Sequence, residues 1–82
     1  YTLLDVREPH EVAICKVAGS LDIPMQQVPQ RLSELPKDGA IVVMCHHGGR
    51  SRMVTNFLRQ NGYAGALNLK GGIDAWAQAV EP

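Results

Sequence analysis

Short apolar runs alternate along this chain with segments that have the character of helices. Four runs are short, apolar and bounded by turn residues, which is typical of strands, and they lie at residues 2–6, 20–24, 40–45 and 66–69. Four other segments predict helices, most of them with apolar residues on one helical face, and they lie at residues 7–14, 25–35, 51–62 and 71–80. This alternation predicts an α/β fold with a mostly parallel sheet and helices on both of its faces.

Prolines and glycines mark several of these elements. Pro9 falls where the first turn of a helix tolerates a proline, whereas Pro29 is the weak point of the helix predicted at residues 25–35. Gly62 stands where a glycine commonly ends a helix. The run at residues 40–45 is apolar on both faces, which predicts a central parallel strand.

The length and charge of the chain limit its classes of function. With 82 residues it is expected to form one domain, spanning residues 1–82, with a single small core. Its 8 basic residues balance 8 acidic ones, so neither nucleic acid nor an anionic membrane is expected as a partner. No stretch approaches the roughly 20 apolar residues of a membrane span. The 2 cysteines do not suggest a disulfide framework, and we expect a reducing, cytoplasmic setting.

Cys45 is the first candidate for chemistry. It ends the most apolar run, and open parallel sheets bind ligands at the carboxyl ends of their strands. Gly48 and Gly49 accept positive φ at little cost, so the loop after Cys45 can turn tightly. The amides of such a turn and the start of the next helix favour negative charge, and Arg50 adds a positive charge. These features predict a thiolate nucleophile in a loop that holds anions.

Three kinds of chemistry come into question for this loop. Metal binding is disfavoured, because His46 and His47 directly follow Cys45 and no second cluster has ligand spacing; we expect exposed histidines and neither a metal nor a cofactor. A cysteine phosphatase or arsenate reductase would carry an oxyanion on sulfur, whereas a sulfurtransferase would carry one extra sulfur atom. Only four residues separate Cys45 from Arg50, and this short loop favours the single sulfur.

Four motifs follow one another along the chain, namely LLDVRE (residues 3–8), AGSLDIP (18–24), CHHGGRS (45–51) and NLKGGIDAW (68–76). In this order they resemble the motifs of rhodanese-like sulfurtransferase domains of the single-domain type, and they cover nearly the whole chain. The resemblance implies a three-layer α/β/α domain with a five-stranded, mostly parallel sheet. The family has a further strand or helix before LLDVRE, so we expect a domain truncated at its N-terminus, with a less well covered sheet edge.

The resemblance also implies a two-step transfer of a sulfane sulfur. Cys45 is implied as the catalytic residue, which takes the sulfur from thiosulfate or a protein persulfide and passes it to a thiol, cyanide or a sulfur-carrier protein. The tail is similar to that of rhodanese domains in enzymes that adenylate ubiquitin-like carriers. The alternative is a non-catalytic regulatory or binding module of a larger protein. The implied substrate-binding loop consists of His46, His47, Gly48, Gly49, Arg50 and Ser51.

Some residues outside the loop have two interpretations. Asp5 and Arg7 end the first predicted strand and, like Arg52, are candidates for contact with substrate or loop. For Asp5 and Arg7 we favour a buried ion pair that serves the fold, since charges near a core are normally kept only when paired. Cys15 stands in a stretch where many family members have Gly-His-Ile, and it is interpreted as a packing residue. Trp76 is expected in the core.

Overall fold

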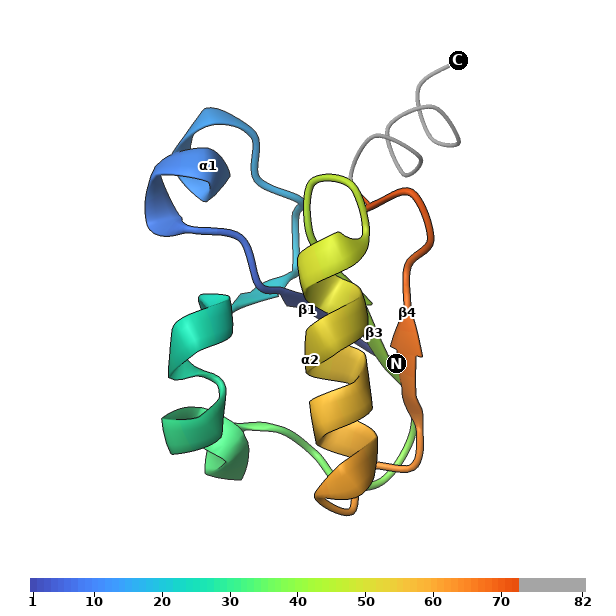
Figure 1. The fold of residues 1–82 in the computed structure, drawn as a ribbon. Coiled ribbons are helices and arrows are strands. Elements are labelled where there is room, and N and C mark those ends of the chain that lie inside the picture. The colour runs from blue at the N-terminus through green and yellow to red at the C-terminus, as the bar shows by residue number, and fades with distance from the viewer. Residues whose placement is uncertain (73–82) are drawn as a thin grey trace.

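The computed structural model describes residues 1–72, and in this range the chain forms a parallel sheet with helices packed against it (Figure 1). The sheet has the order β2-β1-β3-β4, and its strands are β1 (Thr2–Asp5), β2 (Leu21–Asp22), β3 (Ile41–Met44) and β4 (Ala66–Asn68). Neighbouring strands are all parallel, with Leu4 opposite Val43 and Val43 opposite Asn68. The part of the chain that the structure describes thus has four strands, where the resemblance implied five.

Helical segments connect the strands. They are the α-helices α1 (Pro9–Ile14) and α2 (Gly49–Gln60) and the 3-10 helices η1 (Met25–Gln27) and η2 (Pro29–Glu34). The single helix predicted at residues 25–35 is wrong. Pro29 has no N–H to offer the carbonyl of Met25, which instead accepts from the N–H of Val28 at 3.3 Å, so the chain tightens into 3-10 turns. The helix predicted at residues 71–80, which includes Trp76, extends beyond the described residues.

The larger core lies between the sheet and the helices α2, η1 and η2. Leu4 and Val43 of the sheet are fully buried in this core, as is Leu58 of α2. Successive strand residues point to opposite faces, so Leu3 and Met44 are buried on the other side of the sheet. Gly62 has a φ of +93° just after α2, as expected for a glycine that ends a helix.

The parallel strands bring their carboxyl ends to one edge of the sheet. Asp5 ends β1, Cys45 directly follows β3, and Asn68 ends β4. Helix α1 and the loop that joins β3 to α2 lie at this same end of the molecule (Figure 1). Residues that are far apart in the sequence therefore meet around Cys45.

Candidate active site

The thiol of Cys45 lies at the base of the loop between β3 and α2, and only 1% of the residue is exposed. Its Sγ accepts hydrogen bonds from the backbone N–H of Gly48 at 3.1 Å and from that of Ser51 at 3.3 Å. Gly48 is the N-cap of α2, and the first amides of a helix have no partner within it. The start of α2 thus directs two amides at one buried sulfur.

The pKa of the Cys45 thiol lies below its ordinary value. Burial raises this pKa, but hydrogen bonds from the Ser51 hydroxyl and from the amides of Ser51, Gly48 and His47 lower it by more. Each of these donors stabilises negative charge on the sulfur. The nucleophilic thiolate is therefore populated at lower pH than in a free cysteine.

The buried hydroxyl of Ser51 links this sulfur to the end of β4. Its Oγ lies 3.4 Å from Cys45 Sγ and 3.2 Å from the carbonyl oxygen of Gly48, and it donates a short hydrogen bond to Oδ1 of Asn68. A hydroxyl has one proton and can donate it in one direction at a time. While the thiol is protonated, its S–H donates to Ser51 Oγ; once it ionises, Ser51 has to turn its own proton toward Sγ.

Asn68 was not among the residues predicted from the sequence. Besides accepting from Ser51, its Nδ2 donates to the carbonyl oxygen of Gly48 at 3.3 Å, which fixes the orientation of the amide. One signal was available: a polar residue interrupts the apolar run at residues 66–69, and this run ends at the same edge of the sheet as Cys45.

Glycines allow the loop to pack closely against the chain after β4. Gly48 has a φ of +97°, and a Cβ at this position would lie 3.2 Å from the backbone nitrogen of Gly71. A Cβ on Gly72 would overlap the carbonyl oxygen of Cys45. Of the two glycines that could accept positive φ, Gly48 adopts it and Gly49 does not, because Gly49 is already the first residue of α2.

Arg50 is held by an acidic residue that sequence reasoning missed. Its Nη1 and Nη2 donate to Oε1 and Oε2 of Glu11 at 2.5 and 2.9 Å, a two-pronged pair between α2 and α1. Mainly because of this hydrogen bond, the pKa of Glu11 falls to about 2 and that of Arg50 is raised. The N–H of Glu8 also donates to Oε1 of Glu11 at 3.0 Å, closing a capping box at the start of α1. A contact across 39 residues leaves no periodic signal in the sequence.

The remaining loop residues lie at the surface. His46 and His47 are both exposed, with their rings stacked at a centroid distance of 4.1 Å and an angle of 27° between the planes. Arg52 is exposed on α2, where it lines a polar cavity with Asn68 and Lys70. The structure therefore separates the loop into buried donors around the sulfur and an exposed rim of histidines and arginine.

Asp5 and Arg7 form the buried ion pair that we favoured. Arg7 Nη2 donates to Asp5 Oδ2 at 2.7 Å, and Nε lies 3.0 and 3.1 Å from the two carboxylate oxygens. Nη2 also donates to the carbonyl oxygen of Cys15 at 2.5 Å, which ties the end of α1 to β1. Cys15 itself is exposed, so its interpretation as a packing residue is wrong: no residue of α1 is buried, and its end lies at the surface.

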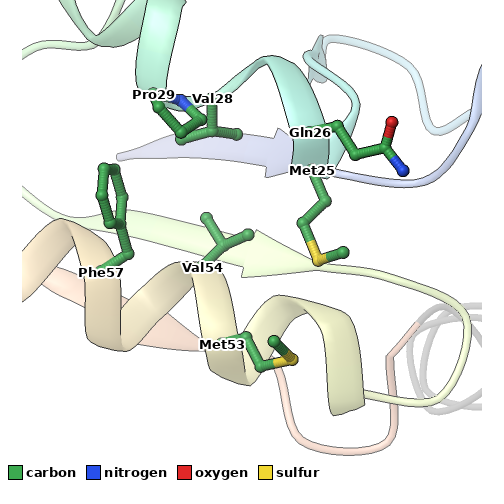
Figure 2. A pocket seen from close by; sticks show the side chains of 7 residues that line it. All are labelled: Met25, Gln26, Val28, Pro29, Met53, Val54 and Phe57. Atoms are coloured by element: carbon green, nitrogen blue, oxygen red, sulfur yellow. The ribbon is translucent and has the colours of Figure 1, made fainter.

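A second cavity is apolar and lies between the 3-10 helices and α2. It has a volume of about 240 Å³, and the side chains of Val54 and Phe57 on α2 face those of Met25, Val28 and Pro29 across it (Figure 2). Within residues 1–72, Gln26 is the one polar residue of its lining, and this part of the chain supplies no charge with which the cavity could bind an anion.

Residues 1–72 contain neither a cluster of metal ligands nor a membrane-spanning helix. No group of three or more His, Cys, Asp or Glu residues in this range is arranged to hold a metal ion. In the same range no helix is long and apolar enough to cross a membrane.

Comparison with known proteins assigns the chain to a family. The family model of the rhodanese-like domain matches residues 1–79. The chain belongs to this family. A sulfurtransferase from Allochromatium vinosum is 45% identical over 76 residues, which cover 93% of this chain and 71% of that protein. The crystal structure of a rhodanese-related protein from Thermoplasma volcanium superposes with a TM-score of 0.90 at 36% identity, covering 100% of this chain and 81% of that one.

Rhodanese-like domains of this kind also occur in longer proteins. The adenylyltransferase and sulfurtransferase MOCS3-2 of Zea mays is 34% identical over 89 residues, which cover 100% of this chain but 18% of that protein. The α/β fold and the family resemblance predicted from the sequence are therefore confirmed, and at the level of the family the activity is sulfur transfer.

Proposed function

We propose that this rhodanese-like domain carries a sulfane sulfur as a persulfide on Cys45. The observation that supports this most directly is the pair of amides, from Gly48 and Ser51, that donate to the buried Sγ. Donors already oriented toward a charge stabilise it without reorganisation during the reaction. The same loop suits the two anions that the reaction requires in turn, the thiolate of Cys45 and the outer sulfur of its persulfide.

The proposed reaction consists of two displacements at sulfur. In the first, the Cys45 thiolate attacks the outer sulfur of thiosulfate; a new S–S bond forms, the S–S bond of thiosulfate breaks, and sulfite leaves with that bond's electron pair. In the second, an acceptor such as cyanide attacks the terminal sulfur of the persulfide, thiocyanate forms, and the thiolate is restored. Covalent storage divides one transfer into two easier steps.

The burial of Cys45 limits the shape of its substrate. Because 1% of the residue is exposed, a donor has to present one narrow reactive atom, as thiosulfate and protein persulfides do. A phosphate ester or arsenate would have to bring a whole tetrahedral group to the same sulfur. The short loop between Cys45 and Arg50 therefore supports sulfur transfer over phosphatase or arsenate reductase chemistry.

The charges of Arg50 and of the exposed rim affect how the loop attracts and stabilises the anionic donor in the proposed reaction. Arg50 shares its charge with Glu11, so it stabilises an incoming anion less than an unpaired arginine would. Arg52 is exposed, and no ion pair to it is found within residues 1–72. We propose that Arg52 attracts the anionic donor, while His46 and His47 form the rim that donor and acceptor approach.

The proposed partners are a small sulfur donor or a persulfide-bearing protein, and a thiol, cyanide or sulfur-carrier protein as acceptor. The name of the maize relative joins adenylyltransferase to sulfurtransferase, which supports a carrier protein with an adenylated C-terminus as one acceptor. Cys15 and Cys45 are both free thiols, as persulfide chemistry in the cytoplasm would require.

Steady-state kinetics with thiosulfate and cyanide test the proposal. We expect ping-pong kinetics in which the double-reciprocal lines for different cyanide concentrations are parallel. Cys45→Ser is expected to abolish turnover, while Cys15→Ser, the matched control at the other cysteine, keeps it. Turnover that survives Cys45→Ser, or a folded wild-type domain without turnover, would reject the proposal, and the latter result would favour a non-catalytic binding module.

A further inference from the structure

A cavity lies between α2 and the end of β4, and its lining within residues 1–72 is entirely polar. It has a volume of about 480 Å³, and its lining consists of Arg52, Thr55, Asn56, Arg59, Asn68 and Lys70. Its size lies within the range of roughly 300–1,000 Å³ that is usual for small-molecule sites. Three of these six residues are cationic and none of the lining residues within 1–72 is a carboxylate, so this lining is suited to an anion.

Most of the basic residues that have no carboxylate partner within residues 1–72 line this cavity. Four cations of the domain are paired with carboxylates, in the pairs Arg7–Asp5, Lys16–Asp22, Arg31–Glu34 and Arg50–Glu11. The other four form no ion pair within residues 1–72, and three of these four line this one cavity. In a chain with no net charge, such a concentration produces a local positive field.

The positions of the cations indicate the shape of the anion. Arg52 and Arg59 are two turns apart on one face of α2, about 10 Å along the helix axis, and Lys70 follows β4 on the other wall. Positive charge is thus spread over a distance longer than a single phosphate. Arg59 uses its Nε to donate to the carbonyl oxygen of Ala66 at 2.9 Å, which holds the side chain along this wall and leaves its terminal nitrogens for a ligand.

We propose that this cavity binds a small polyanion with two linked anionic groups of the diphosphate class. Arginine guanidinium groups bind phosphate oxygens in a two-pronged geometry, and Lys70 and Asn56 supply further donors. The cavity adjoins the Cys45 loop, because Arg52 lines it and Asn68 both lines it and accepts from Ser51 beside Cys45. Binding here is independent of the proposed persulfide and would hold even if that proposal failed.

Calorimetric titration with pyrophosphate at low ionic strength tests the inference on the 82-residue chain. We expect saturable binding that is stronger than for orthophosphate, and about five- to tenfold weaker binding for Lys70→Gln and for Arg59→Gln, each of which removes one charged donor. Lys70 is exposed and has no hydrogen bond or ion pair within residues 1–72, so its variant should fold; thermal unfolding checks this.

Two control variants separate this site from general attraction and from the Cys45 loop. Lys37→Gln removes an equal charge outside the cavity, and Arg50→Gln removes the arginine of the loop; both should keep the wild-type affinity to within about twofold. The inference would be overturned by absence of saturable binding to the wild type, by an equal loss in Lys37→Gln, or by a loss confined to Arg50→Gln. The kinetic assay of sulfur transfer is a separate measurement, so failure of the polyanion inference and failure of the proposed function can be told apart.

Discussion

The sulfur of Cys45 is hydrogen-bonded to two kinds of group: it accepts from backbone amides at the start of α2, and as a thiol it donates to the hydroxyl of Ser51. Amides are fixed by the fold, but the hydroxyl of Ser51 can turn between Asn68 and the sulfur. At the residue scale, Ser51 is therefore the group whose hydrogen bond changes with the charge state of the thiol. Glu11 is the group that determines how much of the positive charge of Arg50 remains available to an anion in the loop.

Replacing Ser51 with Ala should raise the pKa of the Cys45 thiol, because the hydroxyl is the strongest of the donors that lower it. We also expect sulfur transfer at neutral pH to slow on the order of tenfold, through loss of one hydrogen bond to a charged group. The pH dependence of Cys45 alkylation, followed by mass spectrometry in a Cys15→Ser background, measures the pKa.

Thr55→Val is the matched control for this experiment. It removes a buried hydroxyl that donates to the carbonyl oxygen of Ser51 at 2.7 Å one turn further along α2 and has no hydrogen bond to Sγ. An alkylation profile that shifts equally in both variants would show that the effect comes from α2 as a whole and not from the Ser51 hydroxyl.

Replacing Glu11 with Gln should destabilise the fold at neutral pH by about 1 kcal/mol, the value of a partly exposed ion pair. The folded state holds the pKa of Glu11 at about 2, below its ordinary value of 4.5, so this stabilisation is present above pH 4.5 and is lost as the pH falls toward 2. Urea unfolding of both proteins between pH 7 and pH 3 should show the difference narrowing. A difference that stays constant over this range would mean that the ion pair is not its source.

At the scale of elements, the loop between β3 and α2 is shaped by its contact with the chain after β4. Gly48, the N-cap of α2, has a positive φ, donates its amide to the sulfur and packs against Gly71. The space available at position 48 therefore determines where the amide that donates to Cys45 Sγ lies.

Gly48→Ala should cost about 1–2 kcal/mol for its positive φ, and about 1–3 kcal/mol more for the close contact with Gly71. Gly39→Ala is the control, because Gly39 has a φ of +85° and nothing within 4 Å of the added Cβ. Free energies of unfolding for the two variants isolate the contribution of packing. Equal losses in both would contradict a tight contact between the loop and residues 71–72.

Most elements could be predicted from the sequence because their signals are local. The apolar runs predicted the strands, and helical spacing predicted α2. The 3-10 helices were missed because apolar spacing does not register the lost hydrogen bond at Pro29. Glu11 and Asn68 could not be assigned to the site, since each reaches it through tertiary contacts that no spacing along the chain encodes.

At the scale of the molecule, a parallel sheet with all its carboxyl ends at one edge brings Cys45 together with residues from α1 and β4. The same α2 whose first amides face the sulfur also carries Arg52 and Arg59, which line the cavity beside the end of β4. One helix therefore contributes to two anion-binding features, a narrow one for a single sulfur and a wider one for a polyanion.

The central claim concerns a covalent intermediate, and intact-mass spectrometry tests it most directly. After treatment with thiosulfate and removal of excess reagent, the wild-type domain and the Cys15→Ser variant should each gain the mass of one sulfur atom, which cyanide then removes. Cys45→Ser should gain none. A gain that persists in Cys45→Ser, or a folded wild type that gains nothing, would contradict the persulfide on Cys45.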